Sequence, residues 1–139
     1  MRERHPGARL LLDRRGARAV HPVPEGVELA GMDDTATLAA LTGRAWAVAL
    51  ASKDEAFGLV ALEALATGTP AVCTTAEVVD RPSVGQVFDG TPAALLDALD
   101  HAFALAQEPG TRDACRARAG EFPAHATAER YAALYAQLR

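Results

Sequence analysis

The chain has 139 residues, half of them hydrophobic, and a formal net charge of −4 at pH 7. That length suits one domain with one core, and the acidic balance excludes the basic footprint of a nucleic-acid-binding protein. Cys73 and Cys115 lack metal-ligand spacing, so we expect free thiols in a reducing compartment. No apolar run is long enough for a transmembrane segment or a secretory signal, so the sequence predicts a cytoplasmic protein.

The first third of the chain predicts two strands and a helix. Residues 8–12 and 27–31 are short apolar runs typical of strands, and the stretch between them contains prolines and should be loop. A helix is expected over residues 36–43, with Asp34 or Thr35 as its N-cap.

The middle of the chain predicts a strand, a helix and another strand. Residues 45–51 and 70–74 are apolar runs suited to strands buried on both faces. Between them, apolar spacing predicts a helix that ends at Gly68, with Pro70 beyond it. The residues expected to form the packed face of this helix are Leu59, Leu62, Glu63 and Ala66.

The last third predicts helices. Thr91 and Pro92 form a start signal for a long helix, whose inner face should consist of Leu95, Leu99 and Phe103. A further helix is expected over residues 111–122 and a last one from about residue 126. Helical spacing predicts core or interdomain packing for four residues of the last helix, Tyr131, Leu134, Tyr135 and Leu138.

Two carboxylates, Glu55 and Glu63, bracket a glycine and an apolar run where the middle helix begins. A helix N-terminus offers free N–H groups and a partial positive charge to a phosphate, and Gly58 lets a ligand approach the backbone. A carboxylate on a packed helix face needs a hydrogen-bond donor, such as a sugar hydroxyl. The alternative is that Glu55 is only a favourable charge at a helix start and Glu63 a solvated helix residue.

The segment Glu-Ala-Phe-Gly-Leu-Val-Ala-Leu-Glu-Ala-Leu-Ala-Thr-Gly-Thr-Pro-Ala-Val, residues 55–72, resembles the signature of the group 1 (family 4) retaining glycosyltransferases, which have the GT-B fold. The likeness extends over residues 27–31, 77–79, 84–88 and 128–131, and it covers the family's second, donor-binding domain. The resemblance implies an α/β, Rossmann-like three-layer domain with a mostly parallel sheet, a single nucleotide-sugar-binding domain over residues 1–139.

The resemblance also implies roles for individual residues. Glu63 would bind the ribose hydroxyls of a nucleotide-diphosphate sugar, and Glu55, as the catalytic candidate, would bind hydroxyls of the donor sugar. The diphosphate would meet the backbone N–H groups of Gly58, Leu59 and Val60. Met32 and Asp33 would line the base pocket, although a plain turn is an equal alternative. No metal and no further cofactor is expected, since the four histidines lack a second ligand at metal spacing.

The chain departs from the family pattern in what it lacks. Residues 74–77 lack the glycine-containing loop that many relatives have at this place. The basic pair that neutralises the diphosphate in the family would lie on a segment before this chain begins. The N-terminal acceptor domain is absent too, so the isolated chain should not transfer sugar. The alternatives are a truncated, non-catalytic nucleotide- or partner-binding domain and a nucleotide-sugar epimerase fragment.

The family's central first strand is also missing. We therefore expect residues 8–12 to pair directly with residues 45–51, because an empty slot would leave backbone groups unpaired. Apolar surface left by the missing helix should then bind the missing N-terminal half or another copy of the chain.

Overall fold

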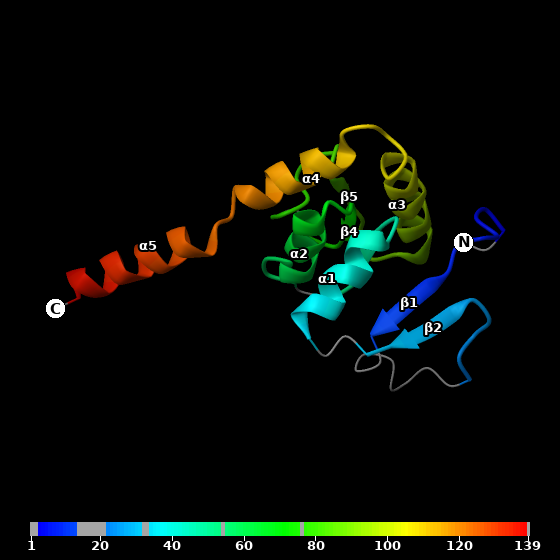
Figure 1. The fold of residues 1–139 in the computed structure, drawn as a ribbon, viewed down its shortest axis with the longest axis horizontal. Helices are drawn as coiled ribbons and strands as arrows, with labels where there is room; N and C mark the ends of the chain where they lie inside the picture. The colour runs from blue at the N-terminus through cyan, green and yellow to red at the C-terminus, as the bar shows by residue number, and fades with distance from the viewer. Residues whose placement is uncertain (1–2, 14–21, 32–33, 54, 76, 139) are drawn as a thin grey trace. The chain divides into compact units, whose positions relative to one another are not determined.

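The computed structural model describes residues 3–13, 22–31, 34–53, 55–75 and 77–138. The chain forms two compact units, Met1–Leu41 and Thr42–Arg139, each with helix and parallel strand. Among the described residues, none of the helices is both long and apolar enough to cross a membrane. In chain order the elements (Figure 1) are β1 (Leu10–Asp13), β2 (Val27–Ala30), α1 (Thr35–Arg44), β3 (Val48–Leu50), α2 (Leu59–Thr67), β4 (Ala71–Cys73), β5 (Gly85–Val87), α3 (Pro92–Leu105), α4 (Thr111–Gly120) and α5 (Ala124–Gln137).

The first unit contains β1, β2 and most of α1. The two strands pair in parallel, with Leu10 opposite Val27. The predicted cap of α1 is confirmed for Asp34, whose carboxylate accepts hydrogen bonds from the N–H of Thr37 (2.9 Å) and from its hydroxyl (2.7 Å). These hydrogen bonds hold the pKa of Asp34 below its ordinary value, so the cap is charged at neutral pH.

The second unit is a three-layer α/β arrangement around a parallel sheet in the order β3-β4-β5. Side chains of β4 alternate between the two faces, as in any strand. Ala71 and Cys73 pack in one cluster with residues of α2 and with Cys115 of α4. Val72 packs in a second cluster with Ala98 and Ala102 of α3. The predicted α/β class with a mostly parallel sheet is therefore confirmed.

Hydrogen bonds between the described strands form two sheets, β1-β2 and β3-β4-β5. The predicted pairing of residues 8–12 with residues 45–51 would join strands of different units, so it stays a prediction; within the units, β1 pairs with β2 and β3 pairs with β4.

The helix α2 and its end at Gly68 are confirmed. Of its predicted packed face, Leu62 packs against the core, whereas the prediction is wrong for Leu59, Glu63 and Ala66, which are exposed. Ala61, Ala64 and Leu65 are fully buried, whereas Glu63 is exposed. Seven of the nine residues in Leu59–Thr67 are apolar, so periodicity does not define one face. The neighbours decide instead, since α2 packs against α4, β3 and β4.

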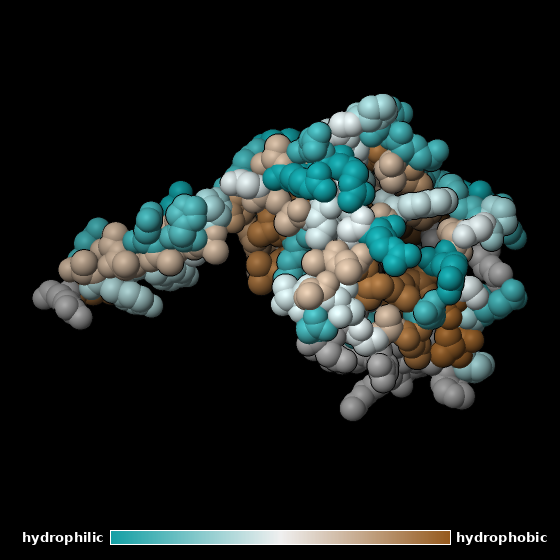
Figure 2. All heavy atoms as spheres, in the orientation of Figure 1, coloured by the Kyte–Doolittle hydropathy of each residue, from teal (hydrophilic) through white to brown (hydrophobic). Residues whose placement is uncertain are grey.

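The helices of the last third begin and end close to their predicted positions. Thr91 caps α3 through a 3.3 Å hydrogen bond from the N–H of Ala94 to its hydroxyl. Phe103 is buried as predicted, and the predicted Leu95 and Leu99 are partly buried against the core. In contrast, α5 has no buried residue. Figure 2 shows apolar and hydrophilic residues side by side along this helix. Core packing is therefore wrong for its predicted stripe, which is exposed at Tyr131, Leu134, Tyr135 and Leu138, and interdomain packing of these residues stays a prediction.

The strand β5 was not predicted from the sequence, and it depends on Gly85. This glycine lies opposite Ala71 of β4 and has a φ of +151°. A Cβ atom at this position would lie 1.8 Å from the carbonyl oxygen of Ala71. Only glycine therefore allows β5 to approach β4 closely enough to complete the sheet.

We predict that Gly85→Ala lowers the free energy of unfolding by about 3 kcal/mol. The new methyl group forces β5 away from β4, and alanine is strained at the φ of this position. The melting temperature should fall by about 10 °C in a thermal unfolding experiment. Gly110→Ala is the matched control, since Gly110 has a φ of +87° but open space around the missing Cβ. That variant should cost only about 1 kcal/mol, and equal losses in the two variants would contradict the steric argument.

Candidate donor-binding site

The site begins where α2 begins, directly after the loop that follows β3. Gly58 precedes Leu59 and has a left-handed backbone, with φ +88° and ψ +53°. A Cβ atom there would also lie 3.3 Å from Cγ2 of Thr75. The side chain of Glu55 accepts a 3.0 Å hydrogen bond from the N–H of Gly58. Gly58 and Glu55 together therefore fix the position of the helix start.

The first N–H groups of α2 have no acceptor within the helix. No acceptor among the described residues contacts the N–H of Leu59 or of Val60. The two residues are 65% and 41% exposed. The helix N-terminus thus presents two N–H groups and a partial positive charge at the surface, which suits an anion.

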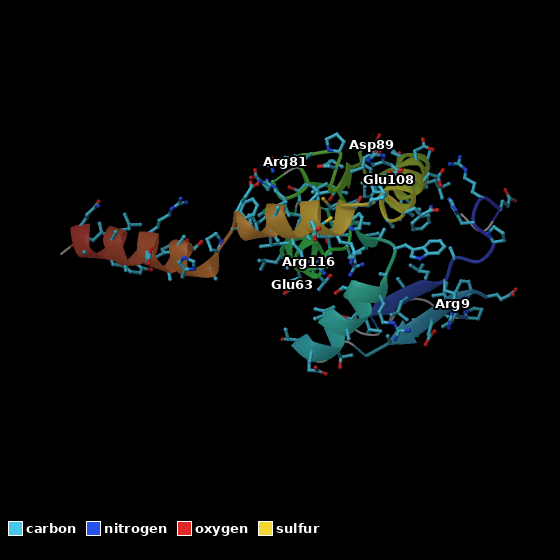
Figure 3. All side chains as sticks on the ribbon, turned by 45° about the horizontal axis from the view of Figure 1, so that its top comes forward. Arg9, Glu63, Arg81, Asp89, Glu108 and Arg116 are labelled. Atoms are coloured by element: carbon cyan, nitrogen blue, oxygen red, sulfur yellow. The ribbon has the colours of Figure 1, made fainter. Side chains whose placement is uncertain are left out.

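The other predicted site residues lie in different settings. Glu63, labelled in Figure 3, is exposed on α2, four residues after Leu59. The side chain therefore has no need of a buried hydrogen-bond partner, contrary to the argument from a packed face. Met32 and Asp33 lie outside the described residues, so their place at the base pocket stays a prediction.

The loop between Glu55 and Gly58 is anchored through Phe57 to the segment that follows α4. The ring of Phe57 meets that of Phe122 edge to face, with centroids 5.4 Å apart. The guanidinium of Arg118 lies over the ring of Phe122, 4.5 Å from its centroid. This stack of two rings and a cation holds the loop against the core.

Arg118 is almost fully buried, and its guanidinium is surrounded by acceptors. Nε donates to the carbonyl oxygen of Val78 (3.0 Å) and Nη2 to that of Glu77 (2.9 Å). Its ion-pair partners are Asp80 and Glu121. Hydrogen bonds from Arg81 and Arg118 hold the pKa of Glu121 below its ordinary value, so this carboxylate is charged at neutral pH.

A polar pocket lies at the carboxyl ends of the three strands of the second sheet. It has a volume of about 340 Å³ and is lined by Ala51, Ser52, Lys53, Thr74, Asp89 and Gly90. The hydroxyl of Thr74 donates a 2.6 Å hydrogen bond to the carbonyl oxygen of Ser52 and so ties the loops after β3 and β4 together. Open parallel sheets bind their ligands at this end.

A second pocket, of about 220 Å³, lies beside β5 and includes Arg81 and His101. It is a poorer candidate because Arg81 is already paired with Glu121, at 2.7 and 2.8 Å. The ring of His101 likewise contacts the carbonyl oxygen of Pro82, at 2.9 Å. Within the described part of the chain, no three side chains of histidine, cysteine, aspartate or glutamate could hold a metal ion together.

Sequence reasoning did not single out Lys53, Thr74 and Asp89, which line this pocket. Each follows a strand of the second sheet, after β3, β4 and β5 respectively. The polar residues after two predicted strands could have indicated the first two, because carboxyl ends of parallel strands share one edge. Asp89 was hidden because β5 itself carries no recognisable apolar run.

The parallel sheet with helices on both faces and a polar pocket at its carboxyl edge defines an α/β, Rossmann-like domain. Residues 19–119 match the family model described as "Glycosyl transferases group 1". The chain belongs to the group 1 glycosyltransferase family.

A named relative agrees with this family. Over 101 residues the chain is 38% identical to D-inositol 3-phosphate glycosyltransferase from Arthrobacter sp. (strain FB24), a match that covers 62% of this chain. The match spans only 23% of that relative's length. No solved structure matches the chain.

We predict that Arg118→Lys lowers the free energy of unfolding by about 2–3 kcal/mol, because an ammonium group cannot replace the fork of guanidinium donors. Denaturant unfolding measures the loss. Arg116→Lys, on the exposed face of the same helix, should change stability by less than about 0.5 kcal/mol. If both variants were as stable as the original chain, Arg118 would not be an anchor of this loop.

Proposed function

We propose that the chain binds a nucleotide-diphosphate sugar and serves as the donor-binding domain of a retaining glycosyltransferase. The observation that carries the proposal is the pair of N–H groups of Leu59 and Val60, without acceptors among the described residues, close in the chain to Glu55. They begin a helix that follows the first strand of a parallel sheet. Membership of the group 1 family supports glycosyl transfer as the reaction.

The diphosphate is assigned to the start of α2. When the bond between sugar and diphosphate breaks, negative charge develops on the leaving diphosphate. The N–H groups of Leu59 and Val60 stabilise that charge without reorganising, because the helix holds them in place. The N–H of Gly58 is already donated to Glu55, so the part of Gly58 is to hold the helix start.

The two glutamates are assigned to hydroxyl groups. Glu63 is exposed one turn along α2 and accepts hydrogen bonds from the ribose. Glu55 uses Oε1 for the N–H of Gly58, which leaves Oε2 to accept from a sugar hydroxyl. We also keep Met32 and Asp33 as candidates for contact with the base, and assign no metal or further cofactor.

A second candidate function is nucleotide binding without catalysis. In both cases the isolated chain binds a nucleoside diphosphate. Sugar transfer by the purified chain to an added acceptor would favour the first.

We predict that a nucleoside diphosphate at 10 mM raises the melting temperature of the chain. With a dissociation constant of about 1 mM, as expected for weak binding, this concentration adds about 1.4 kcal/mol. That corresponds to roughly 3–6 °C in a thermal shift measurement. Uridine, guanosine and adenosine diphosphates should be compared, because the structure does not select among the bases.

Glu63→Ala should abolish most of this shift without changing the melting temperature of the free chain, because Glu63 is exposed. Glu129→Ala is the matched control, since Glu129 is an exposed carboxylate on α5. Absence of a shift with all three nucleotides, or an equal shift in both variants, would contradict the proposed function.

A further inference from the structure

We infer that the outer edge of β5 binds an extended peptide segment of a partner protein, with an apolar side chain of that segment in the pocket beside the strand. This site is separate from the proposed donor site, because the pocket beside β5 shares no lining residue with the pocket at the carboxyl ends of the strands. Its ligand is a peptide, so binding there does not depend on a nucleotide.

The backbone of β5 is paired on one side. In the sheet order β3-β4-β5, the strand has β4 on its inner side and none of the described strands on its outer side. The N–H of Phe88, directly after β5, donates a 3.0 Å hydrogen bond to the carbonyl oxygen of Cys73 in β4. Backbone groups of successive strand residues point to opposite sides, so those of Val87 and Gly85 face away from β4.

The outward backbone groups of Gly85 and Val87 have no hydrogen-bond partner among the described residues. Val87 is 37% exposed, whereas Gly85 is buried and has poorer access to water. A strand laid along this edge would supply the missing partners. The three residues of β5, Gly-Gln-Val, include no charge and no proline, which commonly protect an exposed edge from such pairing.

A pocket of about 220 Å³ lies along the same edge. Its floor is β5, one wall is the turn of residues 79–82, and the other wall is His101 of α3, with no contribution from β4. The ring of His101 contacts the carbonyl oxygen of Pro82 at 2.9 Å and so ties the two walls together. Since a cavity of about 150 Å³ can hold benzene, this pocket is large enough for a branched aliphatic side chain.

The lining of the pocket favours an uncharged side chain. Its apolar residues are Val79, Pro82 and Val87. The guanidinium of Arg81, labelled in Figure 3, is paired with Glu121 at 2.7 and 2.8 Å, and the carboxylate of Asp80 is paired with Arg118 at 3.1 Å. A charged side chain of a ligand would lose water there without gaining a free opposite charge.

The concave shape of the edge distinguishes a peptide from a second copy of the chain. A twofold contact between two β5 edges would bring the same surface of each copy together. The walls of one pocket would then meet the walls of the other, and the two floors would stay apart. A single extended segment is narrow enough to lie between the walls and reach the backbone of β5, so we assign the site to a peptide.

Titration of the ¹⁵N-labelled chain with a synthetic peptide tests the inference. The probe is Lys-Thr-Val-Thr-Val-Thr-Lys with acetyl and amide ends, because β-branched residues favour an extended backbone and alternation places both valines on one face. The amide signals of Gly85, Gln86, Val87 and His101 should shift. No shift of these signals at about 5 mM peptide, a concentration above the millimolar dissociation constant of a weak ligand, would overturn the inference.

Two altered peptides separate the contributions of side chain and backbone. Replacing both valines by threonine keeps charge and shape and should weaken binding severalfold, because the pocket is apolar. Methylating the five central peptide nitrogens removes their hydrogen-bond donors and should abolish binding. Equal binding of the original and the N-methylated peptide would overturn the assignment to strand pairing.

Variants of Val87 test the edge itself. Val87→Pro removes an N–H that faces away from β4, and proline is tolerated at such positions of edge strands. The variant should abolish the shifts caused by the peptide, whereas Val87→Thr, which keeps the N–H, should weaken binding only severalfold. Undiminished shifts in Val87→Pro would overturn the inference, and if that variant failed to fold, the N-methylated peptide would decide.

Self-association is the outcome that would overturn the assigned occupant. Signals of Gly85 and Val87 that move with protein concentration in the absence of peptide, together with a dimer in light scattering, would assign the edge to a second copy. A concentration-independent monomer that binds the peptide is the expected result.

Discussion

The left-handed backbone of Gly58 is the constraint on which the candidate site depends. It turns the chain after the loop from β3 directly into α2, so that the N-terminus of the helix follows the carboxyl end of a parallel strand. The hydrogen bond from Gly58 to Glu55 places a carboxylate at the same point. Any side chain at this position would both strain the backbone and contact Thr75, so the helix start and the site are fixed by one residue.

The core supports this arrangement with small side chains. Ala61, Ala64 and Leu65 bring α2 close to the sheet and to α4. Polar contacts of the buried Arg118 add to this packing. Its guanidinium donates hydrogen bonds to the carbonyl oxygens of Glu77 and Val78. It also lies over the ring of Phe122, which contacts Phe57 in the loop of the candidate site. The elements that carry the N–H groups and the pocket are therefore held in place both by apolar packing and by polar contacts.

The sequence predicted those features that local signals determine. Gly68 at the end of α2 and Thr91 with Pro92 at the start of α3 act within one helical turn, and the structure confirms both. Features set by distant partners were not predictable. The buried face of α2 depends on its packing against α4, and β5 depends on the close approach of Gly85 to Ala71. Asp89 and Lys53 line the same pocket only because β3, β4 and β5 are neighbours in one parallel sheet. The apolar spacing of α5 predicted burial, yet its side chains are exposed.

The most direct test of the central claim is the amide signals of Leu59 and Val60 during titration of the ¹⁵N-labelled chain with a nucleoside diphosphate. If these N–H groups bind the diphosphate, their resonances should shift further than those of Leu95 and Ala114, which donate within the ordinary hydrogen bonding of α3 and α4. The corresponding nucleoside without phosphates should leave them nearly unmoved. Binding of the diphosphate with shifts confined to other segments would contradict the account.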